Sequence, residues 1–320
     1  MVLPKSISYL RRRLSTSRCF RLSGFTLLEL LVAMVVSSIV VSGLLYLVVE
    51  LLKTDRREMV LNQTQQDMQR ALDYIGDDIR EAVYIYSTPS TVVGQLADIV
   101  PSSDGVPILA FWRPEPVDTS VLPAACTSLG ASTTTIFRQC EVLKIRQSAY
   151  SLVVYLQKPK DSNATWKGKS RIVRYKLDKY SNLATLTSTP GYRDPASEGV
   201  NFSTWSSLGT TAGSKSVLVD FVDAPSDPAG YTPSCSSLGT GYTIVPSTAA
   251  TANKSFYGCI RDPSAGTANA ASGGNQDAYL FLRGNIDGAG GVGSLGRDSA
   301  LPTLETRVLM RGVIDKSPTN

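Results

Sequence analysis

The sequence predicts an α+β fold in which one long N-terminal helix packs on an antiparallel β-sheet head with long loops. Residues 25–88 contain no proline and only two glycines, Gly43 and Gly76, so little interrupts a helix there. The chain beyond them contains short, strand-like apolar runs, which stretches rich in Ser, Thr, Gly, Pro and Ala separate. A chain of 320 residues is long enough to bury a sizeable core.

The first 24 residues form a basic segment without an acidic residue. The whole chain has a formal net charge of +5, and without the six basic residues of this segment the charge is 5 − 6 = −1. The pI of about 8.9 therefore reflects the segment and does not indicate a nucleic-acid partner. The six basic residues are Lys5, Arg11, Arg12, Arg13, Arg18 and Arg21.

An uncharged apolar segment follows the basic one. Residues 30–49 carry no formal charge, and as a helix they span about 30 Å, the thickness of a bilayer core. The preceding basic residues favour a cytoplasmic N-terminus with the rest of the chain outside. A conventional secretory signal is the alternative. It fits poorly, because the run is long for such a signal and no small-x-small cleavage site follows it.

The apolar spacing beyond the membrane segment predicts that the same helix continues. An apolar stripe recurs at intervals of three and four residues, and polar residues that include Asp77 and Asp78 are assigned to the other face. Pro89 disfavours the helical conformation at the residue before it. The predicted organisation is a leader at 1–24, a helix at 25–86 and a β-rich head at 87–320. The stripe consists of Met68, Leu72, Ile75, Ile79, Ala82 and Tyr86.

Seven strands are predicted in the head. The segments 141–147 and 150–158 predict one hairpin with a two-residue turn, and the segments 170–177 and 183–187 predict another. Further strands are predicted at 216–222, 278–284 and 306–314. The stretches 224–275 and 284–303 are predicted as long loops.

Four of the five cysteines lie in the predicted head, and none belongs to a C-x-x-C pair, which disfavours a zinc site. Beyond a membrane span they suggest two disulfides in an oxidising compartment. Three pairings are open. The pairs Cys126–Cys140 and Cys235–Cys259 are favoured because each closes a short loop, at about 3 kcal/mol each. Four buried free thiols are the alternative.

No motif supports catalysis or a cofactor. The chain has no histidine, which excludes the commonest general base and metal ligand. Gly288, Gly290 and Gly293 match G-x-G-x-x-G, but the sequence that follows is not helical, as a nucleotide site requires. Asn285 and Asp287 have the spacing of two calcium ligands without the further acidic ligands of an EF-hand. We therefore expect no enzyme, no cofactor and no bound metal.

The junction of the basic and apolar segments carries the most specific motif. A basic leader ends in Gly24, and Phe25 then begins the run "FTLLELLVAM" with Glu29 in it. This motif resembles the type III signal of type IV prepilins and of the pseudopilins of type II secretion. The resemblance implies that a membrane aspartic peptidase cuts after Gly24 and that the new amine of Phe25 is methylated. It also implies a pilin-like fold and no catalytic activity.

The resemblance identifies Glu29 as the family's acidic residue, and physical chemistry supports a role for it. A carboxylate within hydrocarbon costs about 3 kcal/mol on insertion scales unless it has a partner. Cleavage after Gly24 creates one, the ammonium of Phe25, which lies four residues away along the helix. The resemblance also implies that, in a filament, the amine of a neighbouring subunit can serve instead. The alternative is that Glu29 extends to the cytoplasmic headgroups.

The chain's length and loops resemble a minor pilin of the PilW or J-type pseudopilin group, which acts at the filament tip or in initiation. The segment "YLFLRGNIDG" and the C-terminal sequence further resemble pseudopilins of polysaccharide secretion in filamentous (hormogonium-forming) cyanobacteria. The implied partners are the prepilin peptidase, other pilins through the helix, and polysaccharide or protein cargo. The implied location is the cytoplasmic membrane, then a pilus or pseudopilus.

Two rival interpretations stay open. The first is a membrane-anchored adhesin with a glycan-binding head, in which the stretches 224–275 or 284–303 carry the activity. The second is a secreted enzyme that uses the helix only as an anchor.

Overall fold

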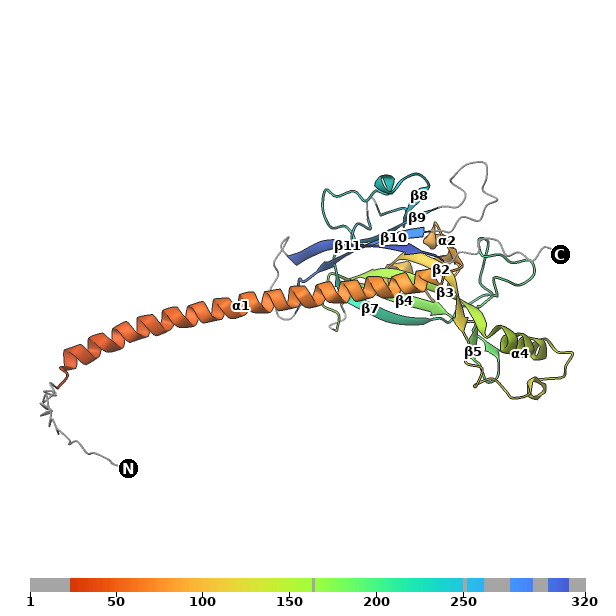
Figure 1. Cartoon of the computed structure of the whole chain (residues 1–320), viewed down its shortest axis with the longest axis horizontal. Coiled ribbons are helices and arrows are strands. Elements are labelled where there is room, and N and C mark those ends of the chain that lie inside the picture. Colours follow the sequence, from red (N-terminus) through yellow and green to blue (C-terminus); the bar gives the residue numbers. More distant parts are fainter. Residues whose placement is uncertain (1–23, 163–164, 250–251, 262–276, 290–298, 311–320) are drawn as a thin grey trace, which may run out of the picture. The chain divides into compact units, whose positions relative to one another are not determined.

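The computed structural model describes residues 24–162, 165–249, 252–261, 277–289 and 299–310. The chain divides into two compact units, Met1–Thr54 and Asp55–Asn320, and each is described by itself. The long helix α1 (Leu27–Arg80) begins in the first unit, and the second unit contains its later turns together with the β-rich head (Figure 1). The predicted α+β class with a long N-terminal helix and an antiparallel sheet is confirmed.

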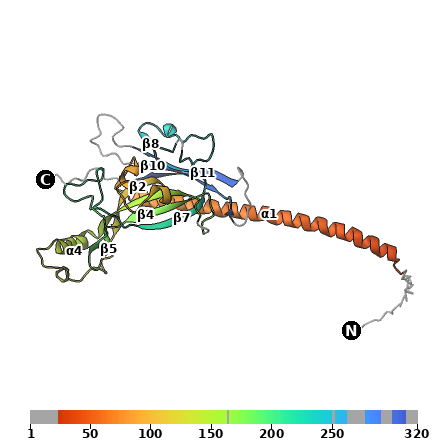
Figure 2. The same cartoon turned by 180° about the vertical axis from the view of Figure 1, so that it is seen from behind.

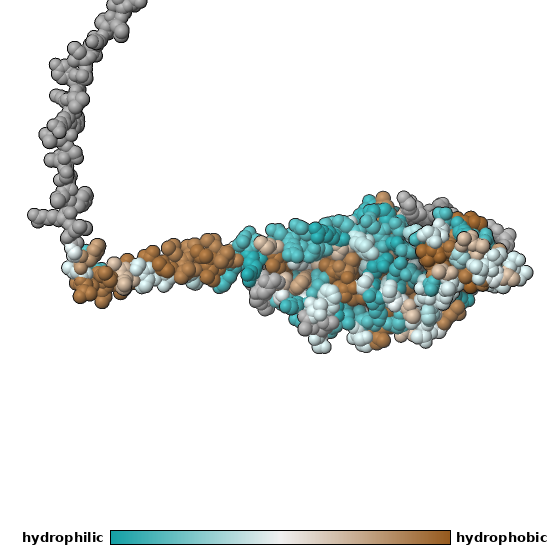
Figure 3. Space-filling view, turned by 90° about the horizontal axis from the view of Figure 1, so that it is seen from below, coloured by the Kyte–Doolittle hydropathy of each residue, from teal (hydrophilic) through white to brown (hydrophobic). Residues whose placement is uncertain are grey.

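Every described residue of the first unit is exposed. By length and composition, α1 contains a segment that can cross a membrane, and Figure 3 shows this part of the helix as largely apolar. The hydroxyls of Ser37 and Ser38 donate to the carbonyls of Met34 and Val35, at 3.0 and 2.8 Å. These polar groups are thus satisfied within the helix, as a hydrocarbon environment requires.

The head is built on one antiparallel sheet of nine strands. The order is β1-β2-β3-β4-β7-β10-β9-β8, and β11 pairs with β10. The strands are β1 (Tyr84–Ile85), β2 (Val106–Pro116), β3 (Ser148–Pro159), β4 (Ser170–Leu177), β7 (Ser214–Val222), β8 (Tyr242–Val245), β9 (Phe256–Arg261), β10 (Asp277–Asn285) and β11 (Ala300–Leu309). A separate two-stranded sheet joins β5 (Tyr180–Asn182) to β6 (Thr187–Ser188). The short helices are α2 (Pro89–Val93), α3 (Pro101–Asp104), α4 (Thr135–Arg146), η1 (Cys126–Ser128) and η2 (Ser236–Leu238).

The later turns of α1 supply one side of the main core. The predicted stripe is buried, and its residues from Met68 to Ala82 lie in this core with apolar residues of β2, β3, β4, β7, β9, β10 and β11. Gly76 allows a close approach at this contact, because a Cβ added there would lie 3.3 Å from Cγ2 of Val308 on β11. The stripe residues within α1 are Met68, Leu72, Ile75 and Ile79.

The strand β2 is buried on both faces. Phe111 belongs to the core beneath α1, whereas its neighbours Ala110 and Trp112 belong to a second core that contains Val92, Tyr192 and Trp205. Burial on both faces gives the strand a continuous apolar sequence without alternation. β2 was not among the predicted strands, because burial on both faces removes the alternation of apolar and polar residues that marks a half-buried strand.

The helix α1 ends at Arg80, before the predicted end at Tyr86. After a last tight turn, the N–H of Val83 donates to the carbonyl of Trp112 at 2.8 Å, and β1 pairs with β2. Ile85 and Tyr86 then point into different cores, as neighbours on a strand do. The aromatic and β-branched residues of this segment favour a strand, although their spacing also fits the helical stripe.

The strand predicted at 141–147 is wrong, because these residues lie mostly in helix α4. The hydroxyl of Thr134 caps this helix by accepting from the N–H of Phe137 at 3.3 Å, and Gln147 ends it in the left-handed conformation. Cys140 and Leu143 form its buried face at helical spacing. The predicted hairpin is therefore absent, and β3 pairs with β2 and β4 instead.

The predicted partners of several other segments also need correction. β4 has the predicted bounds 170–177, but it pairs with β3 and β7, whereas β5 and β6 pair with each other. The predicted loop 224–275 contains β8 and β9, and β11 begins inside the predicted loop 284–303. The end of the strand predicted at 306–314 lies outside the described residues. Short strands in Ser- and Gly-rich sequence gave too weak a pattern to be recognised.

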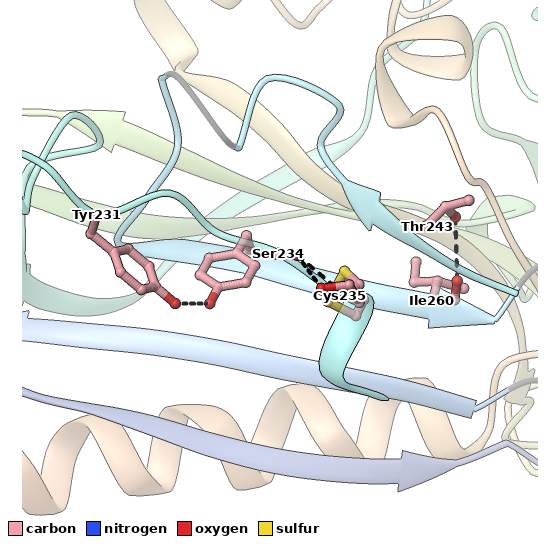
Figure 4. Close-up of a disulfide and its surroundings, with 8 residues drawn as sticks. Tyr231, Ser234, Cys235, Thr243 and Ile260 are labelled. Carbon is pink, nitrogen blue, oxygen red and sulfur yellow. Dashed lines mark hydrogen bonds between the residues drawn. A yellow bond between two sulfur atoms is a disulfide. The ribbon is translucent and has the colours of Figure 1, made fainter. Parts of the chain in front are cut away.

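Two disulfides connect the favoured cysteine pairs, Cys126–Cys140 and Cys235–Cys259. The first joins η1 to α4 inside a small separate core with residues near β5, and α4 lies beside β5 in both views of the head (Figures 1 and 2). The second joins the segment before η2 to β9. Beside it, the hydroxyls of Tyr231 and Tyr257 lie 2.7 Å apart (Figure 4).

Candidate processing and assembly site

Thr26 marks the start of α1. Its carbonyl accepts from the N–H of Leu30 at 3.2 Å, and its hydroxyl accepts from the N–H of Glu29 at 3.3 Å. These bonds make Thr26 the N-cap of the helix. Glu29 occupies the third helical position, so that Thr26 and Glu29 have the spacing of a capping box.

Gly24 and Phe25 lie just before the helix. Gly24, Phe25 and Thr26 have no regular secondary structure, and the side chain of Phe25 is 77% exposed. A Cβ added to Gly24 would meet no atom within 4 Å. The peptide bond between Gly24 and Phe25 is therefore sterically accessible among the residues that the structure describes.

Glu29 lies in the first turn of α1 and is exposed. The positive end of the helix dipole favours a carboxylate in this turn. Within residues 24–54, no other side chain contacts its carboxylate. Phe25 lies four positions before Glu29, so the ammonium that cleavage would create belongs to the same end of the helix.

Glu50 and Lys53 mark the other end of the uncharged segment. Their side chains form an exposed ion pair at 3.7 Å, and the hydroxyl of Thr54 donates to the carbonyl of Glu50 at 3.1 Å. The charged side chains at this end are thus paired with each other.

Asp78 is the residue of α1 that the sequence analysis placed wrongly. It was assigned to the polar face, but it is 4% exposed and faces the sheet. Its Oδ2 accepts from the hydroxyl of Tyr155 at 2.6 Å and from Nε of Arg174 at 2.8 Å, and its Oδ1 accepts from Arg113. Asp78 therefore fixes the rotation of α1 on β2, β3 and β4.

The protonation of Tyr155 fits this cluster. Burial raises the pKa of the Tyr155 phenol well above its ordinary value, and the adjacent Asp78 carboxylate raises it further. The phenol therefore keeps its proton and donates a hydrogen bond to the Asp78 carboxylate. The spacing Ile75–Asp78 places an acid on the apolar stripe, and this signal in the sequence could have identified the cluster.

Of the two residues considered for calcium, Asn285 is engaged by protein groups. Nδ2 of Asn285 donates to Oδ1 of Asp223 at 2.7 Å, and Arg283 pairs with the same carboxylate at 2.9 Å. Lys169 lies 3.6 Å from it. The described residues contain no group of three or more side chains suited to a metal ion. Gly290 and Gly293 of the glycine motif lie outside the described residues.

A groove of about 520 Å³ lies between α1 and β7 in the head. The aromatic side chains of Tyr74 and Trp166 line it, and its charged groups have protein partners. Asp67 pairs with Arg70 at 3.5 Å, and Oδ2 of Asp220 accepts from the backbone N–H of Lys167 at 3.0 Å.

Comparison with known protein families assigns the N-terminal junction. Residues 21–45 match the model of the prokaryotic N-terminal methylation motif. The match covers Gly24, Phe25 and Glu29 together with most of the uncharged part of α1. No curated protein and no solved structure is significantly similar to the chain.

Proposed function

We propose that this chain, which carries a prokaryotic N-terminal methylation motif, is a minor pilin or pseudopilin of a type IV pilus-like or secretion filament. One observation carries the proposal: the motif at residues 21–45 coincides with the start of α1, at a helix that is able to span a membrane. The motif supports the type IV pilin and pseudopilin class, whose members are structural subunits.

The first proposed step is removal of the leader. The prepilin peptidase cuts between Gly24 and Phe25 on the cytoplasmic side, and the new amine of Phe25 is methylated. The accessible, non-helical bond at this position supports this step. The six basic residues of the leader favour its cytoplasmic location, with the head on the outer side of the membrane.

The second proposed step is assembly through the apolar part of α1. Glu29 then pairs with the ammonium of Phe25 in its own chain or in a neighbouring subunit. A charge pair lowers the cost of burying a carboxylate in an apolar environment. The position of Glu29 in the first turn of α1, four residues after Phe25, supports this pairing.

The head supports a minor role in initiation or at the filament tip. The unit Asp55–Asn320 contains two buried disulfides, and long loops connect several of its strands. Such a head suits contacts with other minor subunits or with polysaccharide or protein cargo better than repetition along a filament.

The test is cleavage of the full chain by a prepilin peptidase in membranes. We expect the wild-type chain to lose its leader and the variant Gly24→Val to keep it, because a branched side chain cannot replace glycine at the proposed cleavage position. Gly43→Val is the matched control, since an added Cβ at Gly43 also meets no atom within 4 Å. Retention of the leader by the wild-type chain, or its loss from Gly24→Val, would overturn the proposal.

A further inference from the structure

The position of the helix start relative to the cleaved bond has a chemical consequence. A helix uses the carbonyl of residue i to bind the N–H of residue i+4. If α1 began two residues earlier, the carbonyl of Gly24 would accept from the N–H of Leu28. In the structure the first helical acceptor of α1 is instead the carbonyl of Thr26, which binds the N–H of Leu30 at 3.2 Å.

The hydroxyl of Thr26 is the group that fixes this start. It accepts from the N–H of Glu29 at 3.3 Å and so satisfies a donor that would otherwise be free in the first turn. Next to an apolar segment, an unpaired N–H is costly. If the hydroxyl were removed, the N–H of Glu29 would therefore need another acceptor. Without the hydroxyl, the helical acceptor of this N–H is the carbonyl of Phe25, and one further residue of helix would bind the carbonyl of Gly24 to the N–H of Leu28.

We propose that Thr26 is a positioning residue for cleavage of the Gly24–Phe25 bond. Because of its hydroxyl, the helix begins one residue after this bond. The carbonyl of Gly24 therefore stays free for attack by water. The inference rests on the proposed function, because it concerns the efficiency of the same cleavage. Thr26 takes no part in the chemistry. In the hydrolysis, water adds across the C–N bond and gives the carboxylate of Gly24 and the ammonium of Phe25.

The experiment measures the rate of leader removal by a prepilin peptidase on the full chain in vesicles. Thr26→Val keeps the shape of the side chain but removes the acceptor, whereas Thr26→Ser keeps the hydroxyl. We expect Thr26→Val to lower kcat/KM about fivefold, the factor that corresponds to an ordinary N-cap hydroxyl. We expect Thr26→Ser to restore most of the loss.

Thr54→Val is the matched control. Thr54 lies in the same helix, and its hydroxyl only donates to the carbonyl of Glu50, at 3.1 Å, so its removal should leave cleavage unchanged. A second measurement tests the cap itself. The amide of Glu29 should exchange its hydrogen faster in Thr26→Val than in the wild type if the hydroxyl protects it.

The outcomes separate this inference from the proposed function. A wild-type chain that is not cut between Gly24 and Phe25 would overturn the proposed function. A wild-type chain that is cut there, together with Thr26→Val cut at the same rate, would overturn only the role of Thr26. Equal losses in Thr26→Ser and Thr26→Val would also overturn it, because the hydroxyl would then not be the active group.

Discussion

Oδ2 of Asp78 lies 2.8 Å from Nε of Arg174, and the two side chains join the last turn of α1 to β4. Both are largely buried, with 5% and 12% of the side chain exposed. Arg113 and Tyr155 complete the cluster from β2 and β3. One helix residue thus contacts three adjacent strands and determines which face of α1 the head covers.

Removal of the Asp78 charge should destabilise the head. Asp78→Asn would leave Arg174 and Arg113 buried beside a neutral group, and breaking a buried ion pair costs about 3 kcal/mol. The measurement is urea unfolding of residues 55–320, which form a compact unit with the whole stripe. Asp77→Asn is the control, because the Asp77 side chain is 72% exposed and should change the free energy of unfolding by less than about 0.5 kcal/mol. Equal effects of the two variants would contradict this account of the cluster.

Loss of the first disulfide should act locally. The double variant Cys126→Ser with Cys140→Ser should lower the stability by about 3 kcal/mol, because the bond closes a loop with a sequence separation of 14. The two cysteines belong to the small core that also holds Leu122 and Leu143. Hydrogen exchange should therefore accelerate in α4 and remain slow in β3. Uniform acceleration over the sheet would show that this small core is not separate.

The head should lose stability in alkaline solution. Burial is the main cause of a strongly raised pKa in five tyrosines, so the folded state holds their protons more tightly than the unfolded state does. The unfolded phenols titrate near pH 10, so this stabilisation is fully present below about pH 10 and is lost as the pH rises above it. The tyrosines are Tyr86, Tyr155, Tyr175, Tyr192 and Tyr257.

The measurement for this prediction is the free energy of unfolding of residues 55–320 between about pH 8 and pH 11. Tyr155→Phe should make the decline less steep, because one shifted phenol is removed. Tyr74→Phe is the control, since Tyr74 is 46% exposed whereas Tyr155 is fully buried. A stability that stays constant up to pH 11 would contradict the prediction.

Replacement of Glu29 should separate processing from assembly. Glu29→Val should still be cleaved after Gly24, but it should enter filaments poorly because the ammonium of Phe25 would lack its carboxylate. The measurement compares the amount of the variant in sheared filaments with its amount in the membrane fraction. Glu50→Val is the control at the other end of the uncharged segment, where Glu50 only pairs with Lys53 on the surface. Wild-type incorporation of Glu29→Val would rule out the charge pair.

The parts of the fold that follow local rules could be predicted from the sequence. The uncharged segment and the stripe from Met68 to Ile79 gave the helix and its buried face, because helical spacing is a local property. The strand β4 was recognised with its observed bounds, and the two cysteine pairs follow from short loops of suitable composition.

The parts that depend on distant partners could not be predicted in this way. β2 is buried on both faces, and Tyr84 forms a strand only because the carbonyls and amides of β2 lie beside it. The helix α4 depends on the cap of Thr134 and on the contacts of its disulfide, which outweigh a strand-like composition. Asp78 looked like a surface acid because its partners, Arg113 and Arg174, lie far away in the sequence.

The candidate site shows the same contrast. Gly24, Phe25 and Glu29 belong to one short motif, so their positions could be read directly from the sequence. The role of Thr26 as the N-cap required the structure, because it depends on where the helix begins. The proposed partner of the Glu29 carboxylate depends on a terminus that the proposed cleavage would create.

The most direct test is mass spectrometry of the mature N-terminus, isolated from membranes of cells that contain a prepilin peptidase. The account predicts that the chain begins at Phe25 and carries one methyl group on its amine. An intact leader, or a new N-terminus at any other residue, would contradict the claim that this chain is processed as a prepilin.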